Sequence, residues 1–214
     1  MSPELRDKLE IRELVENWVL WRDACLWDKF RTVWWDDGVM MATWTQGTAD
    51  EFIAMSKAGF DNGVRIVHFY GGSTIEIEGN RAVVQTKMTI SQRALVEGVL
   101  VDVVCTGRMY DFLEKRGIPK KNGEPGKKMK WGYVLRQPIY EKDRMDPVMP
   151  GTWPILDLAK LATFPEGYRY LAYLQSGIGY PVKMDCPGLT GPEVERLYAT
   201  GAAWLAGEEL DWVK

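Results

Sequence analysis

The chain has 214 residues, of which 46% are hydrophobic and 27% charged, enough for one domain with a sizeable core and an extension. A net charge of -3 at pH 7 argues against a nucleic-acid partner, and no apolar run reaches the length of a membrane span. Three cysteines without CxxC spacing and a single histidine exclude a His-rich metal site: Cys25, Cys105, Cys186 and His68. We therefore expect a cytoplasmic protein with free thiols, without metal, cofactor, nucleic-acid partner or membrane partner.

The first sixty residues predict three helices and one strand. Apolar side chains recur at helical spacing, a proline follows a capping serine, and a Thr-x-x-Glu pair has the spacing of a capping box. The predicted elements are a helix over residues 3–25, a short helix ending near Gly38, a strand over 39–44 and a helix over 48–59.

From residue 64 the hydrophobic period changes to two, which predicts strands. These strands are expected over residues 64–70, 73–78, 81–94, 97–113 and 130–143. Helices followed by an antiparallel meander define an α+β fold, with helices packed on one face of a curved antiparallel sheet. The lysine-rich segment 115–128 is interpreted as a solvated hairpin tip rather than an anion-binding patch.

The C-terminal residues differ in pattern from the predicted sheet and its helices. A proline-rich connector follows residue 144, and helical pieces with several aromatic residues follow the connector. We therefore expect an α+β domain over residues 1–143 and a helical extension over 144–214. The extension could close a pocket as a lid, contact another subunit, or pack without touching a ligand.

The single histidine, His68, precedes a predicted β-hairpin, and Asp23 lies on the apolar flank of the first helix. A carboxylate on that flank faces the interior, where an imidazole is a suitable partner. We expect Asp23 to orient the His68 ring and to raise its pKa, which makes the pair an acid-base group. The alternatives are a core histidine bonded to backbone and an Asp23 paired in solvent with Arg22 or Lys29.

Two stretches, LWRDACLWDKFRTVW and HFYGGSTIEIEGNRAVVQTKMTISQR, resemble the SnoaL-like group of the ketosteroid-isomerase and nuclear-transport-factor cone fold, especially its scytalone dehydratase branch. The resemblance covers residues 5–143 and implies that the curved sheet and the N-terminal helices form a cone. It also implies that Asp23 and His68 form the catalytic pair at the open end of this cone. The branch has a second histidine where this chain has Ser91-Gln92-Arg93, and a tyrosine where it has Arg22. The branch has another tyrosine on its first strand, at a position that corresponds to the region of Met41-Ala42 in this chain. With its tail, the chain is also similar to the sphingomonad diarylpropane lyases, which release formaldehyde without a cofactor.

The resemblance implies a cofactor-independent lyase acting on a small aromatic alcohol, by deformylation of a lignin-derived diarylpropane diol or by dehydration. A non-catalytic binding or assembly module of the same fold is the alternative, and a ketosteroid-type isomerase is disfavoured because it relies on a carboxylate base. We expect His68, Asp23 and Arg22 to act in catalysis, and a homodimer or homotrimer to form. Candidates for an aromatic-accepting pocket are Trp44, Phe69, Tyr70, Met88, Gln92, Tyr110, Trp131 and Tyr133.

Overall fold

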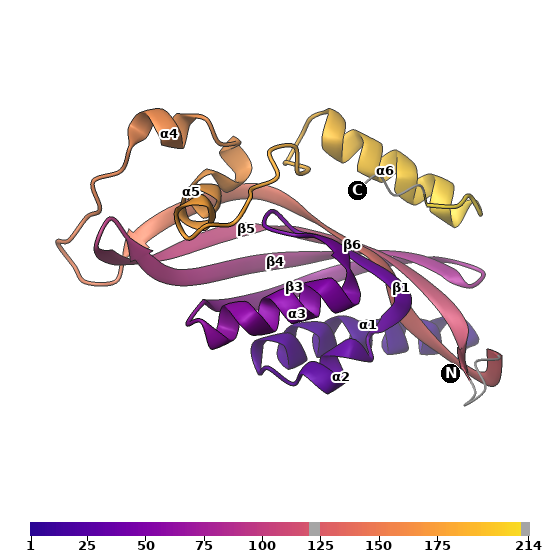
Figure 1. The fold of residues 1–214 in the computed structure, drawn as a ribbon. Coiled ribbons are helices and arrows are strands. Elements are labelled where there is room, and N and C mark those ends of the chain that lie inside the picture. Colours follow the sequence, from indigo (N-terminus) through magenta and orange to yellow (C-terminus); the bar gives the residue numbers. More distant parts are fainter. Residues whose placement is uncertain (120–124, 211–214) are drawn as a thin grey trace.

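The computed structural model describes residues 1–119 and 125–210. Three helices precede most of the sheet, and three helices with one 3-10 turn follow it (Figure 1). In the described part of the chain these are α1 (Pro3–Asp23), α2 (Trp27–Arg31), α3 (Ala49–Asp61), α4 (Leu158–Ala162), η1 (Glu166–Tyr168), α5 (Arg169–Gly177) and α6 (Pro192–Leu205). None of the described helices is both long and apolar enough to cross a membrane.

Six strands of the described residues form one sheet in the order β2-β1-β6-β5-β4-β3. Neighbouring strands are antiparallel, except that β1 runs parallel to β6. The sheet is curved and does not close, so the predicted α+β fold class is confirmed. The strands are β1 (Trp34–Met41), β2 (Gln46–Thr48), β3 (Arg65–Glu78), β4 (Arg81–Val96), β5 (Val99–Pro119) and β6 (Pro125–Pro147).

The predicted helix boundaries are confirmed for α1 and α3 to within a few residues. Ser2 accepts a hydrogen bond from the Leu5 N–H, and Thr48 and Glu51 form the complete capping box at the start of α3. The second helix was predicted too long, because it ends at Arg31 and β1 follows at once. Pairing of β1 with β6, across about a hundred residues of sequence, outweighs the local helical pattern there.

The predicted strands follow the observed order along the chain, with three corrections. The expected strands over 64–70 and 73–78 form one strand, β3, with an irregularity between Tyr70 and Ser73. The short strand β2 was not predicted. Most of the lysine-rich segment extends β5 and β6 instead of forming the hairpin tip, and residues 120–124 of the expected tip lie outside the described residues.

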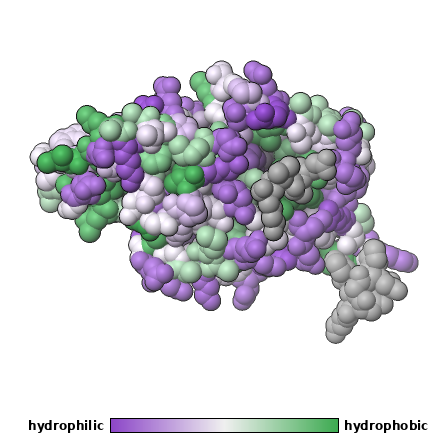
Figure 2. Space-filling model, turned by 45° about the horizontal axis from the view of Figure 1, so that its top comes forward, coloured by the Kyte–Doolittle hydropathy of each residue, from purple (hydrophilic) through white to green (hydrophobic). Residues whose placement is uncertain are grey.

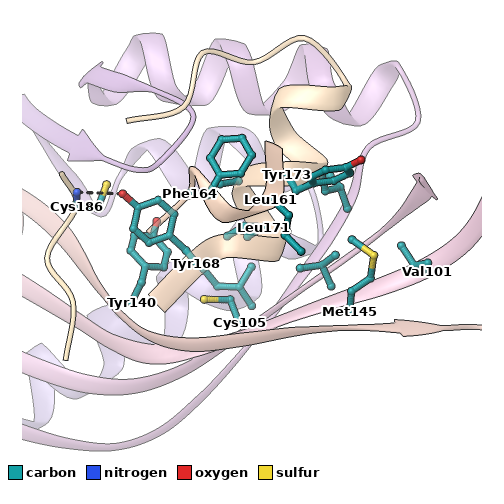
Figure 3. Close-up of a cluster of buried hydrophobic side chains, with 14 of the residues drawn as sticks. Val101, Cys105, Tyr140, Met145, Leu161, Phe164, Tyr168, Leu171, Tyr173 and Cys186 are labelled. Carbon is teal, nitrogen blue, oxygen red and sulfur yellow. Dashed lines mark hydrogen bonds between the residues drawn. The ribbon is translucent and has the colours of Figure 1, made fainter. Parts of the chain in front are cut away.

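The inner face of the sheet carries two core clusters covered by different parts of the chain. At one end, Trp18 and other apolar side chains of α1 pack with Val84 of β4. At the other end, the segment from α4 to α5 packs on β4, β5 and β6, where Leu171 meets Cys105 and Met145 (Figure 3). The C-terminal extension is therefore part of the core.

The opposite face of the sheet is covered by α6 (Figure 1). Val194 and Trp204 of this helix pack on Phe112 of β5. A side chain at Gly201 would collide with the hydroxyl of Tyr110, so glycine permits the close approach of α6 to the sheet.

Exposed hydrophobic side chains gather at the end of the molecule formed by the β4–β5 hairpin and the segment before α4, on the left of Figure 2. Ile155 is 90% exposed, and Trp153 and Met149 are each 66% exposed. We refer to Leu95, Met149, Trp153, Ile155 and Leu158 as the apolar end.

Candidate active site

The centre of the candidate site is a hydrogen-bonded pair between the end of α1 and the inner face of β3. Asp23 Oδ1 lies 2.8 Å from His68 Nδ1, and Asp23 Oδ2 accepts the His68 backbone N–H at 2.6 Å. Because an ionised carboxylate can only accept, Nδ1 carries the ring proton. The other ring nitrogen, Nε2, is then left with a lone pair.

Arg22, the residue before Asp23 in α1, also binds the Asp23 carboxylate. Its Nη1 donates to Asp23 Oδ1 at 3.1 Å and to the carbonyl of Ile66 at 2.9 Å. Burial raises the pKa of Asp23, but the hydrogen bonds that His68 donates and the charge of Arg22 act against burial, and the pKa is lowered from its usual value. Asp23 therefore stays ionised and fixes the orientation of the imidazole.

The pKa of His68 is lowered, which corrects the sequence-based expectation. Burial is the largest cause, because it disfavours the charged ring, and the cations of Arg22 and Arg136 act in the same direction. The hydrogen bond and charge of Asp23 raise the pKa but do not compensate. His68 is therefore a neutral imidazole near pH 7, a state that accepts a proton rather than donating one.

A fully buried ion pair lies beside the imidazole. Arg136 of β6 donates through Nε and Nη2 to the two oxygens of Asp111, each at 2.7 Å. The same guanidinium donates to the hydroxyls of Tyr70 at 2.9 Å and Tyr133 at 2.8 Å. Its Cζ lies 4.2 Å from the centroid of the Trp18 ring.

His68 lines a small, partly open cavity between the two core clusters. The cavity has a volume of about 30 Å³, about the space that one water molecule takes. Leu171 and Gln175 of α5 close one side, and Gln175 accepts a buried hydrogen bond of 2.7 Å from Thr43. A substrate with a ring can enter only if side chains of this cover move.

Three of the residues predicted from sequence line this cavity together with His68: Arg22, Trp44 and Gln92. Tyr70 and Tyr133 lie next to it on the same face, held by Arg136. Met88 also faces inward, but it packs in the cluster under α5.

Three other predicted pocket residues do not lie at the cavity. Phe69 is 73% exposed, because adjacent residues of a strand point to opposite faces and His68 faces inward. Tyr110 lies under α6 on the opposite face for the same reason. Trp131 lies at the far end of β6, where its Nε1 donates to Asp7.

Several residues of the site were not predicted from sequence. They are Trp18, Asp111, Arg136, Tyr140, Thr43 and Gln175. The sequence does contain a signal for the ion pair, since Asp111 and Arg136 each interrupt an apolar strand and pair directly in the β5–β6 register. In the described residues, no three His, Cys, Asp or Glu side chains lie close enough together to hold a metal ion.

A curved, open sheet with helices over its inner face, holding a buried histidine and aspartate, defines the class of nuclear-transport-factor-like α+β proteins. The model of the SnoaL-like domain matches residues 3–123. The chain therefore belongs to the SnoaL-like family, and the family resemblance inferred from sequence is confirmed.

Relatives of similar length match almost the whole chain, including the C-terminal extension. Protein AN9274 of Emericella nidulans is 38% identical over 216 residues, covering 96% of this chain and 88% of its own. Pea pathogenicity protein 2 of Fusarium vanettenii has the same identity and coverage.

Two solved structures confirm the fold at low sequence identity. A putative scytalone dehydratase of Novosphingobium aromaticivorans has a TM-score of 0.52 and 15% identity, and covers 71% of this chain and 95% of its own. The type 3 hexachlorocyclohexane dehydrochlorinase LinA of Novosphingobium barchaimii has a TM-score of 0.51 and 14% identity, covering 72% and 97%.

Proposed function

We propose that the protein is a cofactor-independent lyase in which His68 is the general base and Asp23 orients it. The observation that carries this proposal is the state of the imidazole: Nδ1–H is engaged by Asp23, the ring is neutral, and it lines a cavity. The related folds of a putative scytalone dehydratase and a dehydrochlorinase, both names for eliminations, support the reaction class.

The proposed reaction is loss of water from a hydroxyl group β to a carbonyl. His68 Nε2 takes the proton from the carbon between them, and the C–H electrons move toward the carbonyl oxygen. The carbonyl then re-forms as the carbon–carbon double bond is made and the β-hydroxyl leaves, taking the proton from His68. The products are an unsaturated carbonyl compound and water, and the imidazole returns to its neutral state.

Arg22 and Gln92 support a substrate with these oxygens. Arg22 Nε and Gln92 Oε1 are buried and have no hydrogen-bond partner among the described residues. Leaving such groups unpaired costs about 1–3 kcal/mol each, so a ligand that satisfies them gains affinity. A carbonyl oxygen suits Arg22, whose charge stabilises developing negative charge, and a hydroxyl suits Gln92.

The charges around the site favour an uncharged substrate. Arg22 is paired with Asp23, and Arg136 is paired with Asp111, so each of these two cations has its own carboxylate. An ionised substrate would enter without a counter-ion. A single-ring substrate needs less movement of the cover than the diarylpropane diol, which would lose formaldehyde together with water.

We further propose that α5 and the residues up to Tyr180 form a lid on this cavity. Leu171 and Gln175 of α5 line it, and the ring of Tyr180 lies 5.3 Å from that of Trp44, also in the cavity wall. Movement of this cover would admit the substrate and then exclude water.

The test is turnover of a panel of uncharged cyclic β-hydroxy ketones and aryl diols, followed by the absorbance of the conjugated product and by formaldehyde release. His68→Gln is expected to lower kcat by about two to four orders of magnitude, the range for a lost general base. In the wild type, kcat/KM should fall as pH decreases through the lowered pKa of His68, below its usual 6.5, because the protonated ring cannot accept a proton.

Tyr198→Phe is the matched control, because it removes an aromatic hydroxyl on the α6 side of the sheet. It should leave kcat unchanged. Unchanged kcat in His68→Gln would assign the chemistry to another residue. Binding of these compounds without turnover would favour the non-catalytic binding module.

A further inference from the structure

Arg136 contacts two aromatic residues, Trp18 and Tyr70, that pack against His68. Its guanidinium lies against the face of Trp18 and donates to Tyr70. Trp18 and Tyr70 stack on each other, with ring centroids 6.1 Å apart and an interplanar angle of 17°. One fully buried side chain therefore holds both aromatic rings in place.

The same two rings pack edge-on against the imidazole. The centroid of His68 lies 5.6 Å from that of Trp18, at 89°, and 6.4 Å from that of Tyr70, at 78°. With Asp23 bonded to Nδ1, these contacts leave the ring little freedom to rotate.

The position of Arg136 also matters for charge. The charged or titratable groups that face His68 are Asp23 and Arg22 from α1, Tyr70 on its own strand and Arg136 from β6. Asp111 lies behind Arg136 and balances its charge. In a buried environment these charges act strongly on one another, since little water screens them.

We propose that Arg136 is a positioning residue for His68: it fixes the two rings against which the imidazole packs, and it places its buried positive charge against those rings. The inference concerns the same base as the proposed function and rests on it for its catalytic meaning. Its physical content can be measured without a substrate, because His68 is the only histidine of the chain.

The experiment is an NMR titration of the His68 ring in the full-length protein and in two variants. Asp111→Asn leaves the Arg136 charge without its carboxylate and is expected to lower the pKa of His68 below the wild-type value. The double variant Arg136→Met with Asp111→Leu removes both charges and is expected to raise it. A merely structural role predicts no such opposite shifts.

Arg108→Met is the matched control, because Arg108 lies on the same sheet but pairs with Glu141 and Tyr198 on the α6 side. It should leave the titration unchanged. If Asp111→Asn does not fold, Arg136→Lys is measured instead. Because lysine keeps the positive charge, the pKa of His68 in this variant is expected to stay below its value in the double variant. Shifts in the same direction, or no shift, would overturn the inference, whether or not a substrate is ever turned over.

Discussion

Replacing Asp143 by asparagine is expected to remove a pH dependence of stability that the wild-type chain carries at the base of the proposed lid. Asp143 lies on β6, and its Oδ2 accepts the backbone N–H of Leu171 at the start of α5 at 2.8 Å. Burial raises the pKa of Asp143 from 3.8 to about 6, although the backbone N–H groups of α5 oppose this. Asparagine can accept the same hydrogen bond but cannot ionise.

The sign follows from proton binding. Between pH 3.8 and about 6 the folded state holds a proton on Asp143 that the unfolded state has released, so wild-type stability falls as pH rises through this window. At about 1.4 kcal/mol per pKa unit, the full shift corresponds to about 3 kcal/mol. Partial exposure of the side chain reduces this value. As pH rises through the window, we expect the unfolding free energy of the wild type to fall by about 1–3 kcal/mol relative to that of Asp143→Asn.

Urea unfolding, followed by tryptophan fluorescence from pH 4 to 7.5 in both proteins, measures this difference. Other groups titrate alike in the two proteins, so the difference in unfolding free energy isolates Asp143. Hydrogen exchange of the α5 amides should show the same trend locally. A difference that stays constant over this pH range would refute the reasoning.

Two further predictions concern the core and the assembly. Asp111→Leu should cost about 3–5 kcal/mol by leaving the Arg136 charge buried and unpaired, and thermal unfolding should show the double variant with Arg136→Met regaining most of it; equal losses in the single and double variants would contradict this. We also propose that the chain forms a homodimer or homotrimer, with the apolar end as a contact. Sedimentation velocity should show one of these species at micromolar concentration, whereas a monomer at all concentrations would exclude both.

Local patterns predicted most of the fold because the strands obey strict alternation and the helices carry caps. The same alternation explains an error in the pocket: Phe69 was included for its aromatic ring, but its neighbour His68 faces inward and Phe69 therefore faces outward. The strand at Trp34 could not be predicted locally, since its partner Tyr133 is about a hundred residues away.

The hydrogen-bonded pair was predictable because Asp23 lies on an apolar helix flank and the chain has one histidine. The protonation state of His68 could not be predicted from sequence, because it depends on how completely the ring is buried and on the charge of Arg136, which lies on another strand. Burial and long-range charge are properties of the assembled core. The only sequence signal for such a buried charge is a charged residue within an apolar strand, as at Arg136.

The contacts between α1 and β3 have a consequence for the solubility of the sheet. β3 is an outer strand, and such strands present unpaired backbone groups to which another chain can add. Asp23 occupies the free N–H of His68, and Arg22 occupies the free carbonyl of Ile66 two residues earlier. The side chains that prepare the base therefore also block strand addition at this edge, so that substitutions at Asp23 bear on aggregation as well as on chemistry.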